Sequence, residues 1–398
     1  MQLTRREWIS AGAVAASAAV FPLKEQFPVV HAETCLNNAR WHPLSLGAKK
    51  AIVDYLEYKS AGGGSMPQYS AQQQERVKQL YANLIGAHSS EISFVPSTLA
   101  GENLIVAALG LPAAGGNVVT DALHFEGSLY LYGELQRQGL DVRILKPKAG
   151  RIELNDLEKE IDKNTKLVAV SLVSMINGFQ HDLKAVCERA HAKGAYVFAD
   201  IVQAAGAVPI DAHACGVDFS AGASYKWLMG DMGLGFLYVR EELLARLRRP
   251  QYGYRQLSAM EYHVFPYDTP GNAVFDWKQK NDAAGHFEVG TVSNTTVAAL
   301  SFSLEWLQQI GVSAIQAHRQ PLLQRLQQEL PRLGFEPMTP PDSTSPIVAF
   351  ACKDTERLAK KLNAAKIDIA VYPHRVRISP SLYNGADDVE KLLQCLAS

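Results

Sequence analysis

The stretch FSAGASYKWLMGDMGLGFLYV, residues 219–239, places Lys226 among immediate neighbours that are small, apolar or uncharged. A lysine costs free energy to bury while it carries its charge. Either the side chain reaches solvent, or the amine loses its charge by forming a covalent bond. The second possibility is chemistry, and it requires partner residues elsewhere in the chain.

Short apolar strands alternate with amphipathic helices from about residue 65 to residue 240. The strands are expected at 116–121, 141–146, 165–174, 195–200, 216–220 and 233–240, and the helices at 127–139, 154–164 and 182–194. Such alternation predicts an α/β fold, in which a mostly parallel sheet is covered by helices on both faces.

The chain beyond residue 281 shows helical segments followed by two strand-like ones, 346–352 and 375–379, which predicts a smaller α+β C-terminal domain. Residues 59–67 are typical of a flexible loop, and the Tyr- and Pro-rich residues 250–281 of a long irregular insertion. The predicted division is a signal peptide (1–32), an N-terminal segment that packs with the small domain (33–64), a large domain (65–290) and a small domain (291–398).

The N-terminus carries Arg5 and Arg6 ahead of a small-residue apolar stretch, and VHA, ending at Ala32, suits cleavage. The paired arginines resemble a twin-arginine signal, which predicts recognition by the twin-arginine translocation machinery and a periplasmic protein. A basic amphipathic start and an uncleaved anchor remain alternatives. The stretch is too short and alanine-rich for a good membrane span, so no membrane association is expected after processing.

The composition excludes several other classes of function. The chain has 398 residues and a formal net charge of -1, which gives no reason to expect nucleic acid as a partner. Its five cysteines show no CxxC pair and no metal-like spacing, so buried thiols and no metal site are expected. Walker A, GxGxxG and GxSxG motifs are absent from the sequence.

Asp200 ends an expected strand and is the first candidate partner for Lys226. Ligands of open α/β sheets bind beyond the carboxyl ends of the strands, although an aspartate there can also simply cap a helix. A lysine that forms a Schiff base and a carboxylate that holds a pyridinium nitrogen are the two protein groups that pyridoxal 5'-phosphate needs. Ser97 and Thr98 begin a helix after an apolar strand, which suits the phosphate.

The order of these residues resembles the class V aminotransferase family of pyridoxal phosphate enzymes. DIVQAAG begins at Asp200, and VDFSAGASYK spaces Asp218 from Lys226 as the family does. The resemblance extends from LNNA, at residue 36, to RISPSLYN, ending at residue 384. It implies fold type I, pyridoxal 5'-phosphate as cofactor and a homodimer. The family includes cysteine desulfurases, kynureninases and isopenicillin-N-epimerase-like proteins.

The resemblance also assigns roles to residues. Lys226 is the catalytic Schiff-base lysine, Asp200 holds the ring nitrogen, Gln203 hydrogen-bonds the phenolate oxygen and His124 stacks on the ring. The phosphate is expected to contact Ser97, Thr98 and Leu99, with further contacts from Ser224, Tyr225 and, across the dimer, Thr291. The sequence departs from the family in carrying Ala223 and Tyr225 before the lysine.

Arg377 is the residue that the resemblance assigns to the substrate carboxylate, and Asn38 is a second expected substrate contact. A planar guanidinium offers two parallel donors to a carboxylate. Arg375 lies on the same strand face and is the alternative, and a surface ion pair is the non-functional interpretation. Desulfurases use a cysteine shortly before this arginine and an asparagine at the position of Met175, whereas this chain has no cysteine in residues 367–377. The sequence therefore argues against a cysteine desulfurase.

The reaction stays open. Transamination or oxidative deamination, epimerisation at Cα and carbon–sulfur β-elimination all begin with removal of the Cα proton, for which Lys226 is the expected base. A non-catalytic cofactor-binding protein is the alternative outside enzymology. With its export signal, the chain resembles periplasmic members of the family that tailor peptide siderophores such as pyoverdine. Tyr252, Tyr254 and Arg255 in the insertion would then shape a site for a peptide, or instead form a dimer contact.

Overall fold

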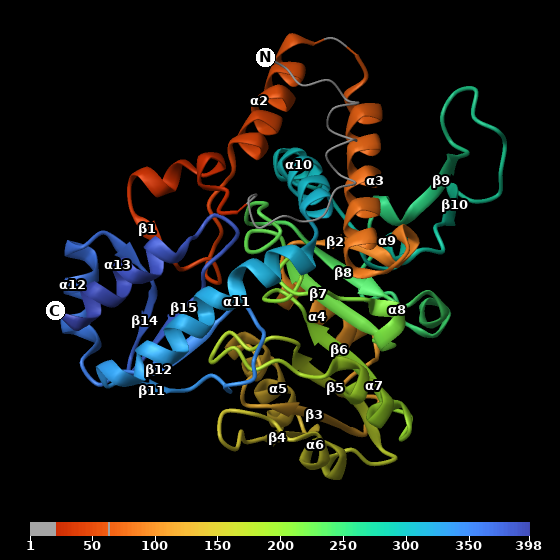
Figure 1. Ribbon diagram of the computed structural model, residues 1–398. Coiled ribbons are helices and arrows are strands. Elements are labelled where there is room, and N and C mark those ends of the chain that lie inside the picture. The colour runs from red at the N-terminus through yellow and green to blue at the C-terminus, as the bar shows by residue number, and fades with distance from the viewer. Residues whose placement is uncertain (1–20, 63) are drawn as a thin grey trace.

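The computed structural model describes residues 21–62 and 64–398 (Figure 1). Arg5, Arg6 and nearly all of the apolar stretch of the expected signal lie outside the described residues.

A seven-stranded sheet forms the centre of the molecule, in the order β2-β8-β7-β6-β5-β3-β4. β8 pairs antiparallel with both of its neighbours, and the pairs from β7 to β4 are parallel, so the sheet is mostly parallel as predicted. The strands are β2 (Ile92–Val95), β3 (Asn117–Asp121), β4 (Asp141–Leu145), β5 (Thr165–Ser171), β6 (Tyr196–Asp200), β7 (Phe219–Ala223) and β8 (Gly235–Val239).

Both faces of this sheet are buried, because alternate residues of its strands enter two different hydrophobic clusters. Val168 and Val197 pack in one cluster with side chains of α7, whereas Leu167 and Phe198 pack in the other with those of α4 and α5. Burial on both sides explains the nearly continuous apolar runs in the sequence. The covering helices are α4 (Thr98–Ala108), α5 (Glu126–Arg137), α6 (Leu154–Glu160), α7 (Leu183–His191), α8 (Ala212–Cys215) and α9 (Ala283–Phe287).

The C-terminal part of the chain builds a second, antiparallel sheet in the order β11-β12-β15-β14. It has its own hydrophobic cluster, and Figure 1 shows it in blue beside the larger sheet. Its elements are β11 (Glu336–Pro337), β12 (Val348–Ala351), β14 (Ala370–Tyr372), β15 (Arg375–Ile378), α11 (Val312–Glu329), α12 (Thr355–Ala364) and α13 (Ala386–Ala397).

The N-terminal segment joins this second sheet region through main-chain pairing. β1 (Thr34–Cys35) pairs in parallel with β13 (Ile367–Asp368), and Asn37 bridges to Ser379. The residues that follow form α2 (Leu46–Ala61) and α3 (Met66–Ile85), which pack against α10 (Asn294–Ile310). α10 was assigned by the sequence to the small domain, yet much of its packing is against these two N-terminal helices.

Two segments differ from the sequence prediction. The loop expected at 59–67 is shorter, since α2 continues to Ala61 and Ser65 caps the start of α3 by accepting from the Gln68 amide at 3.4 Å. The insertion at 250–281 is not irregular throughout. It contains an antiparallel hairpin of β9 (Leu257–Tyr262) and β10 (Phe275–Gln279) that projects from the body (Figure 1). Nearly every strand residue of this hairpin is exposed, so no buried face marked it in the sequence.

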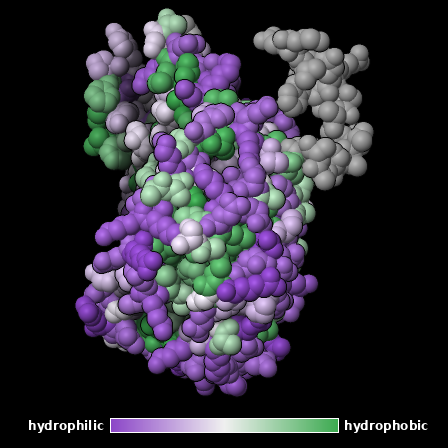
Figure 2. Space-filling model, turned by 60° about the vertical axis from the view of Figure 1, so that its left-hand side comes forward, coloured by the Kyte–Doolittle hydropathy of each residue, from purple (hydrophilic) through white to green (hydrophobic). Residues whose placement is uncertain are grey.

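Hydrophobic side chains on the face shown in Figure 2 gather in separate patches among hydrophilic ones. No helix of the described chain has the length and hydrophobicity needed to cross a membrane. The exposed large hydrophobic residues include a group on the β9–β10 hairpin and the turn between its strands, namely Met260, Tyr262, Val264, Phe265, Tyr267, Val274, Phe275 and Trp277.

Candidate active site

Four parallel strands end at one edge of the large sheet, and the candidate residues lie at these ends or directly after them in the chain. The register pairs Ser171, the last residue of β5, with Asp200, the last of β6, and Asp200 with Ala221 of β7. His124 follows the end of β3, and Lys226 follows the end of β7. This is the edge at which open α/β sheets bind their ligands.

Lys226 is only 7% exposed. In the described part of the chain no carboxylate lies within ion-pairing distance of its Nζ, and the Tyr225 ring centre lies 5.5 Å away. Burial lowers the pKa of Lys226 to about 8, with Asp200 opposing the shift and Arg377 adding to it. Near neutral pH a larger share of the Lys226 amine is therefore neutral than in an exposed lysine, and the neutral form is the one that can attack an aldehyde.

Asp200 is buried at the end of β6 and is incompletely paired. Its Oδ1 accepts a hydrogen bond of 2.9 Å from the Val202 amide, while its Oδ2 lies 3.5 Å from Ser171 Oγ. Burial raises the pKa of Asp200, and His124 and Lys226 oppose this rise. A buried carboxylate with one weakly bonded oxygen is suited to a cationic N–H donor.

The side chain of Gln203 has a fixed orientation. Its Oε1 accepts from the indole of Trp227 at 2.9 Å, and its Nε2 donates to the Ala39 carbonyl at 2.9 Å. The second hydrogen on Nε2 remains available for a ligand oxygen. Gln203 is thus a buried residue held by both the N-terminal segment and the lysine loop.

The N-terminus of α4 carries the residues that are expected to contact the phosphate. Ser97 Oγ caps the helix by accepting from the Ala100 amide at 3.1 Å, and Thr98 Oγ1 accepts from the Ala223 amide at 2.9 Å. Within residues 21–62 and 64–398, the amides of Thr98 and Leu99 make no hydrogen bond in the protein, as is usual for a first helical turn. These amides and the helix dipole favour an anion.

Ser224 and Tyr225 are placed differently from these residues. Ser224 is fully buried, and its hydroxyl lies 2.7 Å from the Leu234 carbonyl and 2.8 Å from that of Asp231, so it closes the loop after Lys226. Tyr225 is half-buried beside Lys226. A phosphate contact from either residue stays a prediction, as does one from Thr291, which is exposed between α9 and α10.

Arg377 is a buried cation without a charged partner. It is 1% exposed, its Nη1 donates to the Met175 carbonyl at 3.2 Å, and its Nε has no partner in the described chain. Burial lowers the pKa of Arg377. Arg375 and Arg40 lower that pKa further, and Tyr372 opposes the shift. An unpaired buried cation is costly, so this position favours an anionic ligand.

The substrate contact expected from Asn38 stays a prediction, and the structure shows which protein groups hold this side chain. It is fully buried, its Nδ2 donates to the Ser379 carbonyl at 2.9 Å, and its Oδ1 accepts from the Tyr383 hydroxyl at 2.8 Å. The amide therefore ties the N-terminal segment to the chain beyond β15. The sequence did not reveal this, because both partners lie far away at the C-terminal end.

Comparison with known proteins identifies the family. The description "Aminotransferase class-V" matches residues 49–392. The chain belongs to the class V aminotransferase family. It is 26% identical over 377 residues to the uncharacterized aminotransferase YcbU of Bacillus subtilis (strain 168), covering 94% of this chain and 96% of that relative. It is 25% identical over 338 residues to a probable cysteine desulfurase of Methanothermobacter thermautotrophicus, covering 82% and 80%.

Solved structures of this class V fold superpose closely. The apo cysteine desulfurase of Thermococcus onnurineus NA1 gives a TM-score of 0.81 at 23% identity, covering 94% of this chain and 96% of that one. The cystine C–S lyase C-DES, in complex with its product cysteine persulfide, gives 0.80 at 20% identity, covering 94% and 99%. At these identities the likeness shows the shared fold type I architecture.

Enzymes of this family depend on pyridoxal 5'-phosphate, and the side chains of this class V member fit that cofactor. A buried amine with a lowered pKa, a buried and underbonded carboxylate and an open helix N-terminus lie along one sheet edge. Gly101 lets α4 approach β7 closely, since a Cβ there would lie 2.9 Å from that of Ala221. The chain is therefore a pyridoxal phosphate enzyme, and Lys226 and Asp200 are the residues expected to hold the cofactor.

Three residues that sequence reasoning missed adjoin the site. Trp227 orients Gln203, Arg319 lies with its Cζ 5.3 Å from the Trp227 ring centre, and Glu102 contacts His124 at 3.1 Å. Glu102 had a usable signal in the sequence, as a charged residue inside the otherwise apolar helix that follows Ser97. Arg319 gave none, because its burial depends on packing between distant elements.

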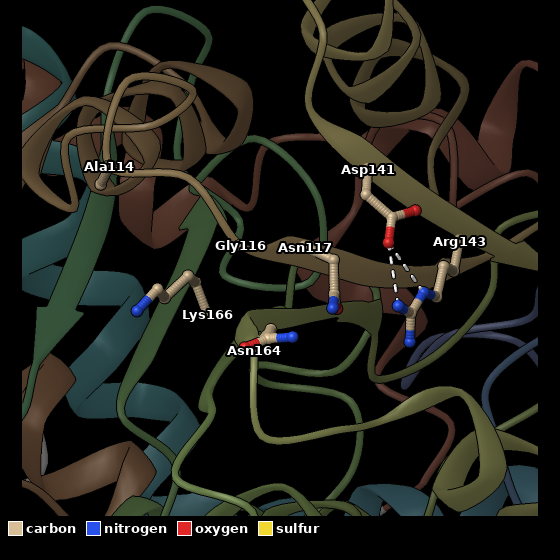
Figure 3. Close-up of a pocket in the computed structure, with 7 residues that line it drawn as sticks. All are labelled: Ala114, Gly116, Asn117, Asp141, Arg143, Asn164 and Lys166. Atoms are coloured by element: carbon tan, nitrogen blue, oxygen red, sulfur yellow. Dashed lines mark hydrogen bonds and ion pairs between the residues drawn. The ribbon is translucent and has the colours of Figure 1, made fainter.

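Figure 3 shows a cavity of about 290 Å³ that lies away from these residues. It is found at the amino ends of β3, β4 and β5, the opposite edge from Asp200 and Lys226. Its prominent charged side chains are paired, since Arg143 donates to Asp141 at 2.9 Å. We do not assign the active site to it. The lining residues are Ala114, Gly116, Asn117, Asp141, Arg143, Asn164 and Lys166.

Proposed function

We propose that this enzyme acts at the Cα of a free amino acid, or of an amino-acid residue of a peptide, in a reaction of the transaminase or deaminase type. The observation that supports this best is Arg377, a buried guanidinium with no acidic partner in the described chain, close enough to Lys226 to lower its pKa. A substrate carboxylate on Arg377 would place its Cα near the lysine amine.

Each residue has a distinct task in this proposal. The cofactor, when bound, supplies an electron sink for the substrate's α-carbon. Asp200 keeps a ring N–H proton in place, and Gln203 donates its free Nε2 hydrogen to a ring oxygen. Lys226 Nζ accepts the proton from the substrate Cα and can return it. Arg377 binds and orients the substrate carboxylate.

The proposal argues against cysteine desulfurization, although several relatives carry that name. β14 and β15 are joined by the tight turn at Pro373 and His374, with no cysteine between Ile367 and Arg377. A nucleophilic thiol needs a lowered pKa. Burial instead raises the pKa values of four thiols, those of Cys35, Cys187, Cys215 and Cys352.

Epimerisation and carbon–sulfur β-elimination share the first proton transfer and are the alternatives, together with a non-catalytic cofactor-binding role. A panel of amino acids and peptides in D₂O, analysed by mass spectrometry, separates them. With an α-keto acid added as amino acceptor for transamination, or O₂ as oxidant for oxidative deamination, we expect Cα–H exchange with a keto product. Exchange with inversion alone indicates an epimerase, pyruvate with sulfide from cysteine a lyase, and no exchange or spectral change with any substrate overturns the proposal.

We further propose that the enzyme works in the periplasm and that its substrate is a peptide siderophore precursor. The support is the Arg5–Arg6 signal in the sequence and the hairpin with exposed aromatic residues, which suits a substrate larger than a free amino acid. Replacing both arginines by lysine should retain the folded protein in the cytoplasm. Unchanged periplasmic recovery from a strain without the twin-arginine translocase would remove this part of the proposal.

A further inference from the structure

Glu102 is a fully buried carboxylate in α4, the helix whose N-terminus faces the expected phosphate. Three side chains from neighbouring elements contact it. Ser128 Oγ donates at 2.5 Å and the Tyr132 hydroxyl at 2.8 Å, both from α5, and His124 Nε2 lies 3.1 Å away. A carboxylate is rarely buried to this degree without such partners.

The contacts continue from His124 to the candidate partner of the cofactor ring. His124 Nδ1 lies 2.8 Å from Ser171 Oγ, and Ser171 Oγ lies 3.5 Å from Asp200 Oδ2. These residues are at most 5% exposed. A buried path of polar groups therefore runs from Glu102 to Asp200, and interactions inside it are weakly screened by solvent.

The donor and acceptor capacities of these side chains fix the position of one proton along this path. An ionised Glu102 can only accept, so His124 must carry a hydrogen on Nε2. His124 Nδ1 then has two options. Neutral, it accepts the Ser171 hydroxyl proton; protonated, it donates to Ser171 and leaves that hydroxyl free to donate to Asp200.

Other charged groups also face His124. Burial lowers its pKa, but Glu102, then Asp200 and Asp121, outweigh this and leave it above the ordinary value. Asp121 is itself bonded to His181 at 3.1 Å, and the Tyr132 ring lies 6.3 Å from the His124 ring. Glu102 is the carboxylate in direct contact with the imidazole.

We propose that Glu102 is a positioning residue of the cofactor site, which fixes the tautomer of His124 and favours its protonated form beneath the ring. In that form Ser171 donates to Asp200, so the charge of Glu102 reaches the carboxylate that holds the ring nitrogen. The inference rests on the proposed placement of His124 and Asp200 against the cofactor. Glu102 thereby becomes a further residue of the site, and it influences how strongly the cofactor ring holds its protons.

Glu102→Gln in the holoenzyme tests this through the visible absorption of the bound cofactor. Without the carboxylate, His124 loses the proton that Glu102 favours, so the positive charge nearest the ring disappears and Ser171 no longer donates to Asp200. The pH at which the cofactor band changes should therefore rise by about one unit. Ser128→Ala is the matched control, because it removes a hydrogen bond to Glu102 but leaves the charge, and it should lower thermal stability without moving that pH.

Ser171→Ala keeps the test decisive if Glu102→Gln does not fold. It breaks the path between His124 and Asp200 and should also displace the spectral transition, by a smaller amount. Unshifted spectra in both variants, or a shift as large in Ser128→Ala, would show that Glu102 only joins α4 to α5. A shifted spectral transition in Glu102→Gln with normal cofactor retention, together with a parent enzyme that turns over no substrate, would leave this inference standing. That result would remove the proposed reaction instead.

Discussion

The indole Nε1 of Trp227 donates a 2.9 Å hydrogen bond to Oε1 of Gln203. The donor is the residue next to Lys226, and the acceptor belongs to the loop after β6, so the bond joins the two loops that carry the candidate lysine and carboxylate. Arg319 lies over the Trp227 ring, with its Cζ 5.3 Å from the ring centre, and its guanidinium donates to the Ala207 carbonyl. The amide of Gln203 is thereby held in one orientation.

Trp227→Phe should loosen the cofactor roughly tenfold. The ring that packs on Arg319 is retained, but the buried Oε1 of Gln203 loses its donor, which costs on the order of 1–3 kcal/mol. Equilibrium dialysis of the apoprotein with pyridoxal 5'-phosphate measures the change. Trp306→Phe in α10 is the control, since Trp306 packs against Phe302 and should leave cofactor affinity unaltered. Equal affinities in both variants would contradict the prediction.

The stability of the apoprotein should depend on Lys226 above neutral pH. Its pKa is 10.5 in an ordinary environment and about 8 when buried, so the unfolded chain binds more protons between these values. Stability therefore rises with pH across this window, and below pH 8 the charged lysine destabilises the fold by about 3 kcal/mol at most.

The measurement compares Lys226→Met with the parent apoprotein by urea unfolding from pH 7 to 10.5. The variant should be the more stable one at the lower end, and the difference should narrow as pH rises toward 10.5. The exposed Lys184→Met controls for a general effect of removing a lysine. A constant difference across the range would show that Lys226 is not buried as a charged group.

Replacing Arg377 and replacing Arg375 should have different effects on the KM for the substrate and on the stability of the apoprotein. Arg377→Met removes a buried cation without an acidic partner, so the apoprotein should become no less stable, while KM for the carboxylate substrate rises about 10- to 100-fold. Arg375→Met should change KM less than threefold, because Arg375 is half-buried and stacks on Tyr372 with its Cζ at 4.5 Å. Steady-state kinetics and thermal unfolding of both variants decide between them. The reverse order of KM effects would assign the carboxylate to Arg375.

The sequence was sufficient where a local pattern sets the position. Asp200 follows an apolar strand, Lys226 follows another, and Ser97 precedes a helix, so strand ends and the cap could be placed without knowledge of distant residues. The mostly parallel sheet follows from the same patterns, because each strand is buried on both faces.

Long-range contacts could not be predicted in this way. The hydrogen bonds of Asn38 to Ser379 and Tyr383 join the two ends of the chain, and no local pattern in the sequence indicates them. The β9–β10 hairpin is formed by cross-strand pairing and has no buried face, and the short alternation at Phe275 and Trp277 stands within a Tyr- and Pro-rich segment that is typical of irregular structure. The contacts of Glu102 depend on the packing of α4 against α5, so its role could not be predicted from the sequence.

One hydroxyl expected to bind phosphate within the protomer is committed to the protein, which bears on the predicted dimer. The Ser224 hydroxyl is directed at main-chain carbonyls, whereas Thr98 Oγ1 only accepts, from the Ala223 amide, and keeps its own hydrogen for a phosphate oxygen. Thr291, by contrast, is exposed in the turn before α10. A donor from a second copy of the chain would complete the phosphate site.

Thr291→Ala should therefore weaken both cofactor binding and dimerisation. A hydrogen bond to a charged oxygen contributes about 1.5–3 kcal/mol, so the Kd for the cofactor should rise roughly tenfold or more. Since a ligand that binds only the dimer stabilises it by mass action, the dimer should weaken when cofactor is present and change little in its absence. Light scattering and dialysis measure the two effects, with the exposed Thr295→Ala as control. A parent protein that is monomeric at micromolar concentration while fully loaded with cofactor would disprove the shared site.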